Sequence, residues 1–324
     1  MPILGRSLLD TRTLSKNDID EIFLKADGLA PLVKTLSARR TGDSFRARVP
    51  VVCCLFFEPS TRTRMSFQMA AYRLGYEVLT MELSAGSSLS KGETLTDTVL
   101  NFAAMKPDVL VVRYGISQEL DQLLPTIEIP VINAGSGTLA HPTQGLLDAY
   151  TLRSEWGDLR GKNVLIFGDV LHSRVARSNF DVLAKQGAVV GITGPARMMP
   201  QAAMRESLHR EFGMRFFETL DEGLPWADAT MGLRIQLERH EARELDLSSD
   251  YHDRYGLTKK RLENLKPDAL ILHPGPINPG VEFCVTVVRD GRSRVLSQVT
   301  NGVTVRAALL AMVLGDDVER NLKI

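Results

Sequence analysis

The sequence predicts an α/β protein of two domains, each a mostly parallel sheet flanked by helices, with the functional site in the cleft between them. A chain of 324 residues has room for about two domains of ordinary size, each with its own core. Short apolar runs alternate with stretches of helical spacing, which is typical of parallel sheets covered by helices on both faces. In such sheets ligands bind beyond the carboxyl ends of the strands.

The elements fall into two series along the chain. An acidic start and apolar spacing predict a first helix over residues 16–37. The apolar runs of the first series predict strands at 51–57, 76–82, 108–113 and 129–133. Those of the second series predict strands at 163–168, 188–193, 228–233 and 269–272.

The two series meet near a helix that begins after His141-Pro142. A proline suits the first turn of a helix, which supports this start. We therefore expect one domain over residues 1–141 and a second over residues 142–302. Apolar spacing predicts a last helix over residues 303–324, which we expect to pack back onto the first domain.

The charge balance argues against two classes of partner. Lysine plus arginine and aspartate plus glutamate each number 39, so the formal net charge is zero. Proteins that coat nucleic acid or an anionic membrane usually carry a basic surplus, so we expect neither partner. Arginines with a function must then act in a focused pocket.

The cysteines and the N-terminus indicate a cytoplasmic protein. The chain has three cysteines, Cys53, Cys54 and Cys284, which lack both a disulfide framework and metal-binding spacing. The first two lie in an apolar run and are expected to be core residues. No run reaches membrane-spanning length, and the first residues lack the apolar stretch of a signal peptide.

The segment Ser60-Thr61-Arg62-Thr63-Arg64 is the most informative motif. It follows an apolar strand and opens a segment with helical spacing, with Ser60 as the expected N-cap. Free amides and the helix dipole favour an anion there, and a guanidinium adds a bidentate clamp. Arg62 is the ligand candidate, and Arg64 is expected to be a supporting or interdomain charge. An ordinary capped helix with solvated arginines is the alternative.

Residues 84–92 form a loop of small residues that cannot pack a core. A solvated connection and a mobile lid bearing Lys91 are both compatible with this composition. Three further candidates lie at the end of a strand or at the start of a helix. Arg113 ends a strand, and His141 and Gln144 lie at a helix start after a glycine-rich turn, where a neutral imidazole can donate to a carbonyl oxygen.

The second half of the chain supplies more arginines. The turn after residue 167 resembles that of a dinucleotide fold but lacks its glycines, so a nicotinamide cofactor is not expected. Arg174 in this turn is expected to point into a cleft, and Arg234, with Gln236 on the same side of the segment after a later strand, is a second such arginine. Two prolines stiffen His273-Pro274-Gly275-Pro276, whose carbonyls can orient an amine.

The candidates together indicate electrostatic catalysis. The sequence has no nucleophile elbow, metal-ligand spacing or Walker lysine, so neither a cofactor nor a metal is expected. A cluster of arginines, hydroxyls, one histidine and one lysine suits two anionic substrates held together while charge builds on oxygen.

The chain resembles the aspartate/ornithine carbamoyltransferase family over essentially its whole length. The resemblance rests on Phe56-x-Glu58-x-Ser60-Thr61-Arg62-Thr63 and on His141-Pro142-x-Gln144. Arg234-x-Gln236-x-Glu238-Arg239 and His273-Pro274-Gly275-Pro276 resemble the aspartate branch. Pro279 departs from that branch, in which similar sequences often carry arginine.

The resemblance implies transfer of a carbamoyl group from carbamoyl phosphate to L-aspartate in pyrimidine biosynthesis, without a covalent enzyme intermediate. It implies that Ser60, Thr61, Arg62 and Thr63 hold the phosphate. Thr63, Arg113 and His141 would polarise the carbonyl oxygen, and Gln144 would bind the carbamoyl amide. The aspartate carboxylates would contact Arg174, Arg234 and Gln236, and the carbonyls of Pro274 and Gly275 would orient the amine and the carbamoyl group.

The resemblance also implies a homotrimer with shared sites, in which Lys91, with Ser87 or Ser88, reaches in from a neighbouring subunit. Assembly with a regulatory chain or a dihydroorotase stays open. Two alternatives remain for the function: a carbamoyltransferase acting on another amino acid, and a non-catalytic anion-binding scaffold subunit.

Overall fold

The computed structural model describes residues 5–34, 49–82, 92–235 and 250–315. Its contacts divide the chain into two compact units, Met1–Leu147 with Val299–Ile324, and Asp148–Gln298. Two long helices, α5 (Pro142–Trp156) and α12 (Val295–Val313), contain residues of both units. The predicted assignment of one substrate to residues 1–141 and the other to residues 142–302 stays a prediction.

The first unit contains a four-stranded parallel sheet in the order β2-β1-β3-β4. All four predicted strands of the first series form, with shifts of one to three residues at their ends: β1 Val51–Phe56, β2 Glu77–Glu82, β3 Val109–Tyr114 and β4 Val131–Ser136. The two central strands, β1 and β3, are almost wholly buried, which explains why they read as unbroken apolar runs.

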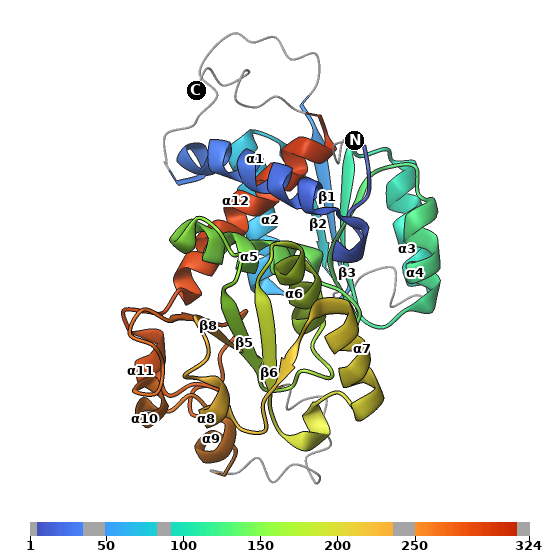
Figure 1. Cartoon of the computed structure of the whole chain (residues 1–324). Helices are drawn as coiled ribbons and strands as arrows, with labels where there is room; N and C mark the ends of the chain where they lie inside the picture. The colour runs from blue at the N-terminus through green and yellow to red at the C-terminus, as the bar shows by residue number, and fades with distance from the viewer. Residues whose placement is uncertain (1–4, 35–48, 83–91, 236–249, 316–324) are drawn as a thin grey trace. The chain divides into compact units, whose positions relative to one another are not determined.

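Helices cover both faces of this sheet, with α3 and α4 on one face and α1, α2 and α12 on the other (Figure 1). Their bounds are α1 Lys16–Lys34, α2 Thr61–Leu74, α3 Leu95–Ala104 and α4 Gln118–Leu123, with 3-10 turns at Thr11–Thr13 and Leu124–Thr126. A core of apolar side chains, among them Leu55, Val99 and Leu110, fills the space between the sheet and α3–α4. The N-terminal segment adds to the edge of β4, where Leu8 bridges to Ile132.

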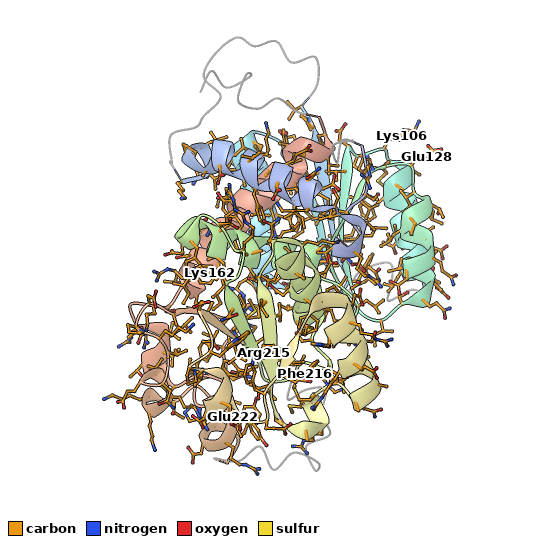
Figure 2. The ribbon with its side chains drawn as sticks, viewed as in Figure 1. Lys106, Glu128, Lys162, Arg215, Phe216 and Glu222 are labelled. Atoms are coloured by element: carbon orange, nitrogen blue, oxygen red, sulfur yellow. The ribbon has the colours of Figure 1, made fainter. Side chains whose placement is uncertain are left out.

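The second unit contains a five-stranded parallel sheet in the order β7-β6-β5-β8-β9. The predicted strands of the second series all form: β5 Asn163–Phe167, β6 Val189–Thr193, β8 Ala229–Gly232 and β9 Leu270–Leu272. The edge strand β7, Arg215–Phe216, was not predicted. It has only two residues and one of them is charged, so it forms no apolar run. Figure 2 labels both side chains. Its parallel backbone pairing with β6 makes it a strand, although its own sequence does not predict one.

Helices α6 and α7 lie on one side of this sheet, and α8, α10 and α11 lie on the other (Figure 1). Their bounds are α6 Arg174–Lys185, α7 Ala202–Phe212, α8 Leu220–Gly223, α9 Asp250–Tyr255, α10 Lys259–Leu262 and α11 Val285–Val288, with a 3-10 turn at Ala196–Met198. Within the described ranges, no helix is both long enough and apolar enough to cross a bilayer.

The last helix differs from its prediction. It begins at Val295, eight residues before the expected start at 303, and ends at Val313. Its first turns carry polar residues such as Gln298 and Asn301, so the sequence shows no apolar spacing there. Both side chains are nevertheless buried. Residues 316–324 of the expected helix lie outside the described part.

Candidate active site

The start of α2, called the socket here, is where an anion is predicted to bind. Ser60 is the N-cap with an extended backbone, its carbonyl accepts from the Arg64 amide, and its side chain makes no capping hydrogen bond among the described residues. Thr63 is buried, whereas Thr61 and Arg62 are exposed. The first amides of α2, which lack intrahelical partners, therefore follow directly on the loop that leaves β1, together with Thr61 and Arg62.

Arg62 and Arg64 have different environments, as their spacing predicts. Arg64 is partly buried and forms an ion pair with Glu82 at the end of β2. This contact makes Arg64 a supporting charge within the first unit. Arg62 precedes it by two residues and lies in the first turn of the helix, where an anion would bind.

Arg113 lies beside this socket. Its backbone carbonyl accepts from the Phe57 amide (2.8 Å), which joins the end of β3 to the loop that leads into α2. The buried guanidinium donates from Nη1 to the Ala134 carbonyl (3.0 Å), and Nη2 lies 3.4 Å from a carboxylate oxygen of Glu58. Arg113 therefore lies next to the loop that leads into α2, and contacts with Ala134 and Glu58 hold its guanidinium in place.

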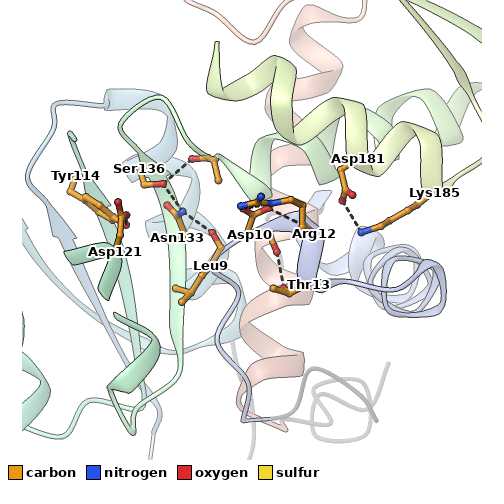
Figure 3. Close-up of polar contacts among 11 residues, drawn as sticks. Leu9, Asp10, Arg12, Thr13, Tyr114, Asp121, Asn133, Ser136, Asp181 and Lys185 are labelled. Atoms are coloured by element: carbon orange, nitrogen blue, oxygen red, sulfur yellow. Dashed lines mark hydrogen bonds and ion pairs between the residues drawn. The ribbon is translucent and has the colours of Figure 1, made fainter. Parts of the chain in front are cut away.

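The turn after β4 delivers His141 and Gln144, both of them buried, to the start of α5. Asn133 shapes this turn, because its side chain accepts from the Gly135 amide (2.7 Å) and donates to Ser136 Oγ and to the Leu9 carbonyl (Figure 3). Gly135 has a φ of 125°, which favours glycine. Sequence reasoning noted the glycines of this turn but missed Asn133.

Arg306 on α12 joins α2 to the start of α5. It is buried, and its guanidinium donates to Ser66 Oγ on α2 (2.8 Å) and to Thr143 Oγ1 on α5 (3.3 Å). It also lies over the ring of Phe67, with 5.2 Å between Cζ and the ring centroid. Arg306 was not among the predicted site residues, although an arginine on the apolar side of a helix is a signal that could have identified it.

In the second unit, Arg174 is the first residue of α6. Ser173 caps this helix through a hydrogen bond from the Ala176 amide to its hydroxyl (3.1 Å). The turn begins at Gly168, whose φ is 113°, and a Cβ there would meet the Leu233 carbonyl at 3.1 Å. Arg174 therefore lies beyond the carboxyl end of β5, where ligands bind in parallel sheets.

Arg234 follows β8 and is held by its neighbour. The amide of Ile235 donates to Glu282 Oε1 (2.7 Å), and Asn278 donates to both oxygens of the same buried carboxylate. Glu282 thus joins the segment after β8 to the loop after β9. Sequence reasoning missed Glu282, because a lone glutamate in a loop carries no local signal of burial.

The turn after β9 contains Pro274 and Gly275. The Gly275 amide donates to Nδ1 of His273 (2.8 Å), and Gly275 has a φ of 66°. The His273 ring is buried edge-on against Phe283, with 5.1 Å between ring centroids. The carbonyls of Pro274 and Gly275 therefore belong to a turn with a fixed shape. Gln236, Lys91, Ser87 and Ser88 lie outside the described residues.

The buried carboxyl of Glu282 should make the free energy of unfolding depend on pH in a direction that can be predicted. Burial raises its pKa above the ordinary value of 4.5, although hydrogen bonds from Ile235 and Asn278 oppose the shift. The contribution of Glu282 to stability is then complete below the unfolded pKa and is lost as the pH rises through the folded pKa. We expect Glu282→Gln to gain stability relative to the wild type as the pH rises from about 4 to 8, measured by urea denaturation.

Asp290→Asn is the matched control of opposite sign. A side-chain hydrogen bond from Arg292 lowers the pKa of Asp290 below its ordinary value of 3.8. Its contribution to stability is present above the unfolded pKa and is lost as the pH falls through the folded pKa. A stability difference between Glu282→Gln and the wild type that does not change with pH would contradict the prediction.

The profiles of two known protein domains match the two halves of this chain. Residues 6–154 match the profile of the aspartate/ornithine carbamoyltransferase carbamoyl-P binding domain, and residues 160–313 match that of the Asp/Orn binding domain. Two α/β units that match these two profiles, in this order, define a carbamoyltransferase. The chain belongs to the aspartate/ornithine carbamoyltransferase family.

Several similar proteins are in the aspartate branch. The aspartate carbamoyltransferase catalytic subunit of Gemmatimonas aurantiaca is 45% identical over 312 residues, 96% of this chain and 94% of that protein. That of Myxococcus xanthus is 49% identical over 263 residues, 81% of this chain and 86% of that protein. The Trypanosoma cruzi aspartate transcarbamoylase, solved with carbamoyl aspartate and phosphate, superimposes with a TM-score of 0.82 at 28% identity and covers 96% of each chain.

Proposed function

We propose that this enzyme transfers the carbamoyl group of carbamoyl phosphate to L-aspartate, yielding N-carbamoyl-L-aspartate and phosphate. The activity is that of an aspartate carbamoyltransferase, a step of pyrimidine biosynthesis. The observation that supports the proposal is a set of contacts in the first unit: Arg113 at the end of β3 contacts the loop that leads into α2, and Arg306 joins α2 to the start of α5. Relatives at 45% and 49% identity carry this activity in their names.

The residues of the first unit are assigned to carbamoyl phosphate. Its phosphate is held by the amides and side chains at the start of α2, namely Ser60, Thr61, Arg62 and Thr63. Thr63, Arg113 and His141 donate to the carbonyl oxygen, and Gln144 binds the carbamoyl amide. The buried position of Arg113, fixed by Ala134 and Glu58, supports this role, because a preorganised donor needs no rearrangement during reaction.

The residues of the second unit are assigned to L-aspartate. Arg174, Arg234 and Gln236 bind its two carboxylates, and the carbonyls of Pro274 and Gly275 orient the amine and the carbamoyl group. Arg174 at a capped helix start and Arg234 after β8 both lie beyond the carboxyl ends of strands. An ornithine side chain would instead require an acidic partner for its second amine.

The reaction needs no covalent enzyme intermediate. The nitrogen lone pair of the aspartate α-amine attacks the carbamoyl carbon, and negative charge moves onto the carbonyl oxygen. The new C–N bond is completed as the C–O bond to phosphate breaks, the phosphate leaves with that electron pair, and the amine loses one proton. Donors aimed at the carbonyl oxygen and at the phosphate stabilise this transition state more than the ground state.

One assay tests the proposal against its alternatives. The purified chain is incubated with carbamoyl phosphate and either L-aspartate or L-ornithine, and the carbamoylated product is measured. We expect turnover with aspartate alone. Turnover with another amino acid would overturn the substrate assignment. Binding of carbamoyl phosphate without any turnover would support a scaffold subunit instead.

We further propose a homotrimer in the cytoplasm, in which Lys91, with Ser87 or Ser88, completes the site of a neighbouring subunit. An apolar surface on α2 supports an interface beside the socket. Met65, Met69 and Tyr72 are 47%, 40% and 69% exposed, and they line a hollow with Tyr76 and Val78. Sedimentation of the chain measures the assembly and separates a trimer from a larger complex with a regulatory chain or a dihydroorotase.

Mixing two inactive variants tests the shared site. Lys91→Ala and His141→Ala chains are each expected to be almost inactive. In randomly mixed trimers, about a quarter of the sites would combine an intact His141 with an intact Lys91 of the neighbour. We expect activity to recover to that extent after the two are dissociated and reassembled together. Mixtures as inactive as their parents would show that Lys91 acts within its own subunit or not at all.

A further inference from the structure

Buried polar side chains form a continuous hydrogen-bonded network in the second unit, apart from the side chains assigned to the substrates. Asp148 on α5 has no exposed surface, and its two oxygens accept from Asn179 Nδ2 (2.9 Å) and Gln298 Nε2 (2.8 Å). Gln298 Oε1 accepts from the His273 amide (2.9 Å). His273 Nδ1 in turn accepts from the Gly275 amide (2.8 Å).

The network joins the segments that carry the proposed acceptor site. Asn179 lies on α6, five residues after Arg174, and it also donates to the Val175 carbonyl (3.0 Å) in the first turn of that helix. His273 and Gly275 belong to the turn whose carbonyls are proposed to orient the amine. Asp148 is the residue at which the branch to α6 and the branch to this turn meet.

Each hydrogen bond in the network has a fixed direction. A glutamine amide has one donor end and one acceptor end, so Gln298 must present Nε2 to Asp148 in order to present Oε1 to the His273 amide. Turning this amide around would place two donors against each other in a buried site, which is costly. The two acceptor oxygens of Asp148 therefore determine the orientation of Gln298, and Gln298 holds the turn after β9.

We propose that Asp148 is a positioning residue for the acceptor half of the reaction. Through Gln298 and His273 it holds the carbonyls of Pro274 and Gly275, and through Asn179 it holds the start of α6 with Arg174. Asp148 itself touches no substrate. This inference rests on the proposed function, because it assigns the held groups to L-aspartate and to its amine.

Asp148→Asn is the first test. The new amide is a donor at one end, so it opposes either the Asn179 amide or the Gln298 amide, and the network must break at one of its branches. Since a displacement of about 1 Å can cost on the order of 100-fold, we expect kcat/KM for aspartate to fall about 100-fold with a raised KM. Inhibition by inorganic phosphate should be unchanged, because phosphate is assigned to residues of the first unit that are not members of the network.

The double variant Asp148→Asn with Gln298→Glu should restore the hydrogen bonds of the network, with the negative charge moved from position 148 to position 298. The new asparagine amide would then accept from Asn179 and donate to the new carboxylate introduced on α12. The other oxygen of that carboxylate would accept from the His273 amide. We expect the kcat/KM of the double variant for aspartate to recover to within about tenfold of the wild type. Gln298→Glu alone places two carboxylates together and should be at least as impaired as Asp148→Asn.

Asp181→Asn is the matched control, on helix α6, which also carries Asn179. Asp181 is a buried carboxylate of α6 that pairs with Lys185 (2.9 Å) rather than with members of the network (Figure 3). Its substitution should leave the KM for aspartate unchanged. A residue with a merely structural role would lower the amount of active enzyme and leave this KM unaltered, so the KM separates the two roles.

The outcomes are distinct from those that test the proposed function. A wild type without aspartate turnover would remove the function itself. With an active wild type, a normal aspartate KM in Asp148→Asn would overturn the positioning role. If that variant is not recovered folded, the double variant is compared with the wild type directly. Kinetics within about tenfold would support the network, and a loss of about 100-fold would overturn it.

Discussion

Replacing Arg62 with alanine is expected to lower kcat by about 10³-fold or more while the chain stays folded. Arg62 is exposed in the first turn of α2, so removing its side chain opens no core cavity. The loss is expected to fall on the transition state, because the leaving phosphate, which we assign to this helix start, gains charge there. Steady-state rates of carbamoyl aspartate formation, with circular dichroism as the check on folding, measure the effect.

Arg64→Ala is the matched control two residues further along the same helix. Its guanidinium pairs with the exposed carboxylate of Glu82, and such partly exposed pairs contribute at most about 1 kcal/mol to stability. We expect its kcat to stay within about tenfold of the wild type. Near-normal turnover by Arg62→Ala, or equal losses in the two variants, would refute the assignment of the phosphate to Arg62.

Replacing Arg174 with alanine is expected to lower kcat/KM for aspartate by about 100-fold, mainly through a raised KM. A charge-assisted hydrogen bond contributes about 1.5–3 kcal/mol, and each 1.4 kcal/mol is about tenfold in affinity. Inhibition by inorganic phosphate should not change, because the phosphate socket lies in the first unit. Initial rates over a range of aspartate concentrations separate KM from kcat.

Arg177→Ala serves as the control for this prediction. Arg177 lies one turn further along α6, is exposed, and donates a long hydrogen bond of 3.2 Å to the Leu171 carbonyl. We expect the variant to keep the wild-type KM for aspartate. If Arg174→Ala also keeps that KM, aspartate binding must be assigned to Arg234 and Gln236 without Arg174.

The sequence by itself determined every strand of the two described sheets except β7, and it marked where the two proposed anion sites begin. Period and composition are local properties, so the runs at 51–57 and 163–168 predict buried parallel strands without knowledge of their neighbours. The cluster of hydroxyls and arginines from Ser60 to Arg64 is likewise local, because capping and the helix dipole act within one turn. The family resemblance then supplied the chemistry that connects these separate motifs.

Only the tertiary structure decided which side chains hold these motifs in place. Arg306, Asn133, Glu282 and Asp148 are polar residues that each have a hydrogen-bond partner far away in sequence, so the residues around them do not show what they contact. Arg306, for example, contacts Ser66 across 240 positions, and Gln298 contacts Asp148 across 150. A buried polar group is stable only where its hydrogen bonds are met, and that condition is a property of the folded neighbourhood rather than of the sequence around the residue.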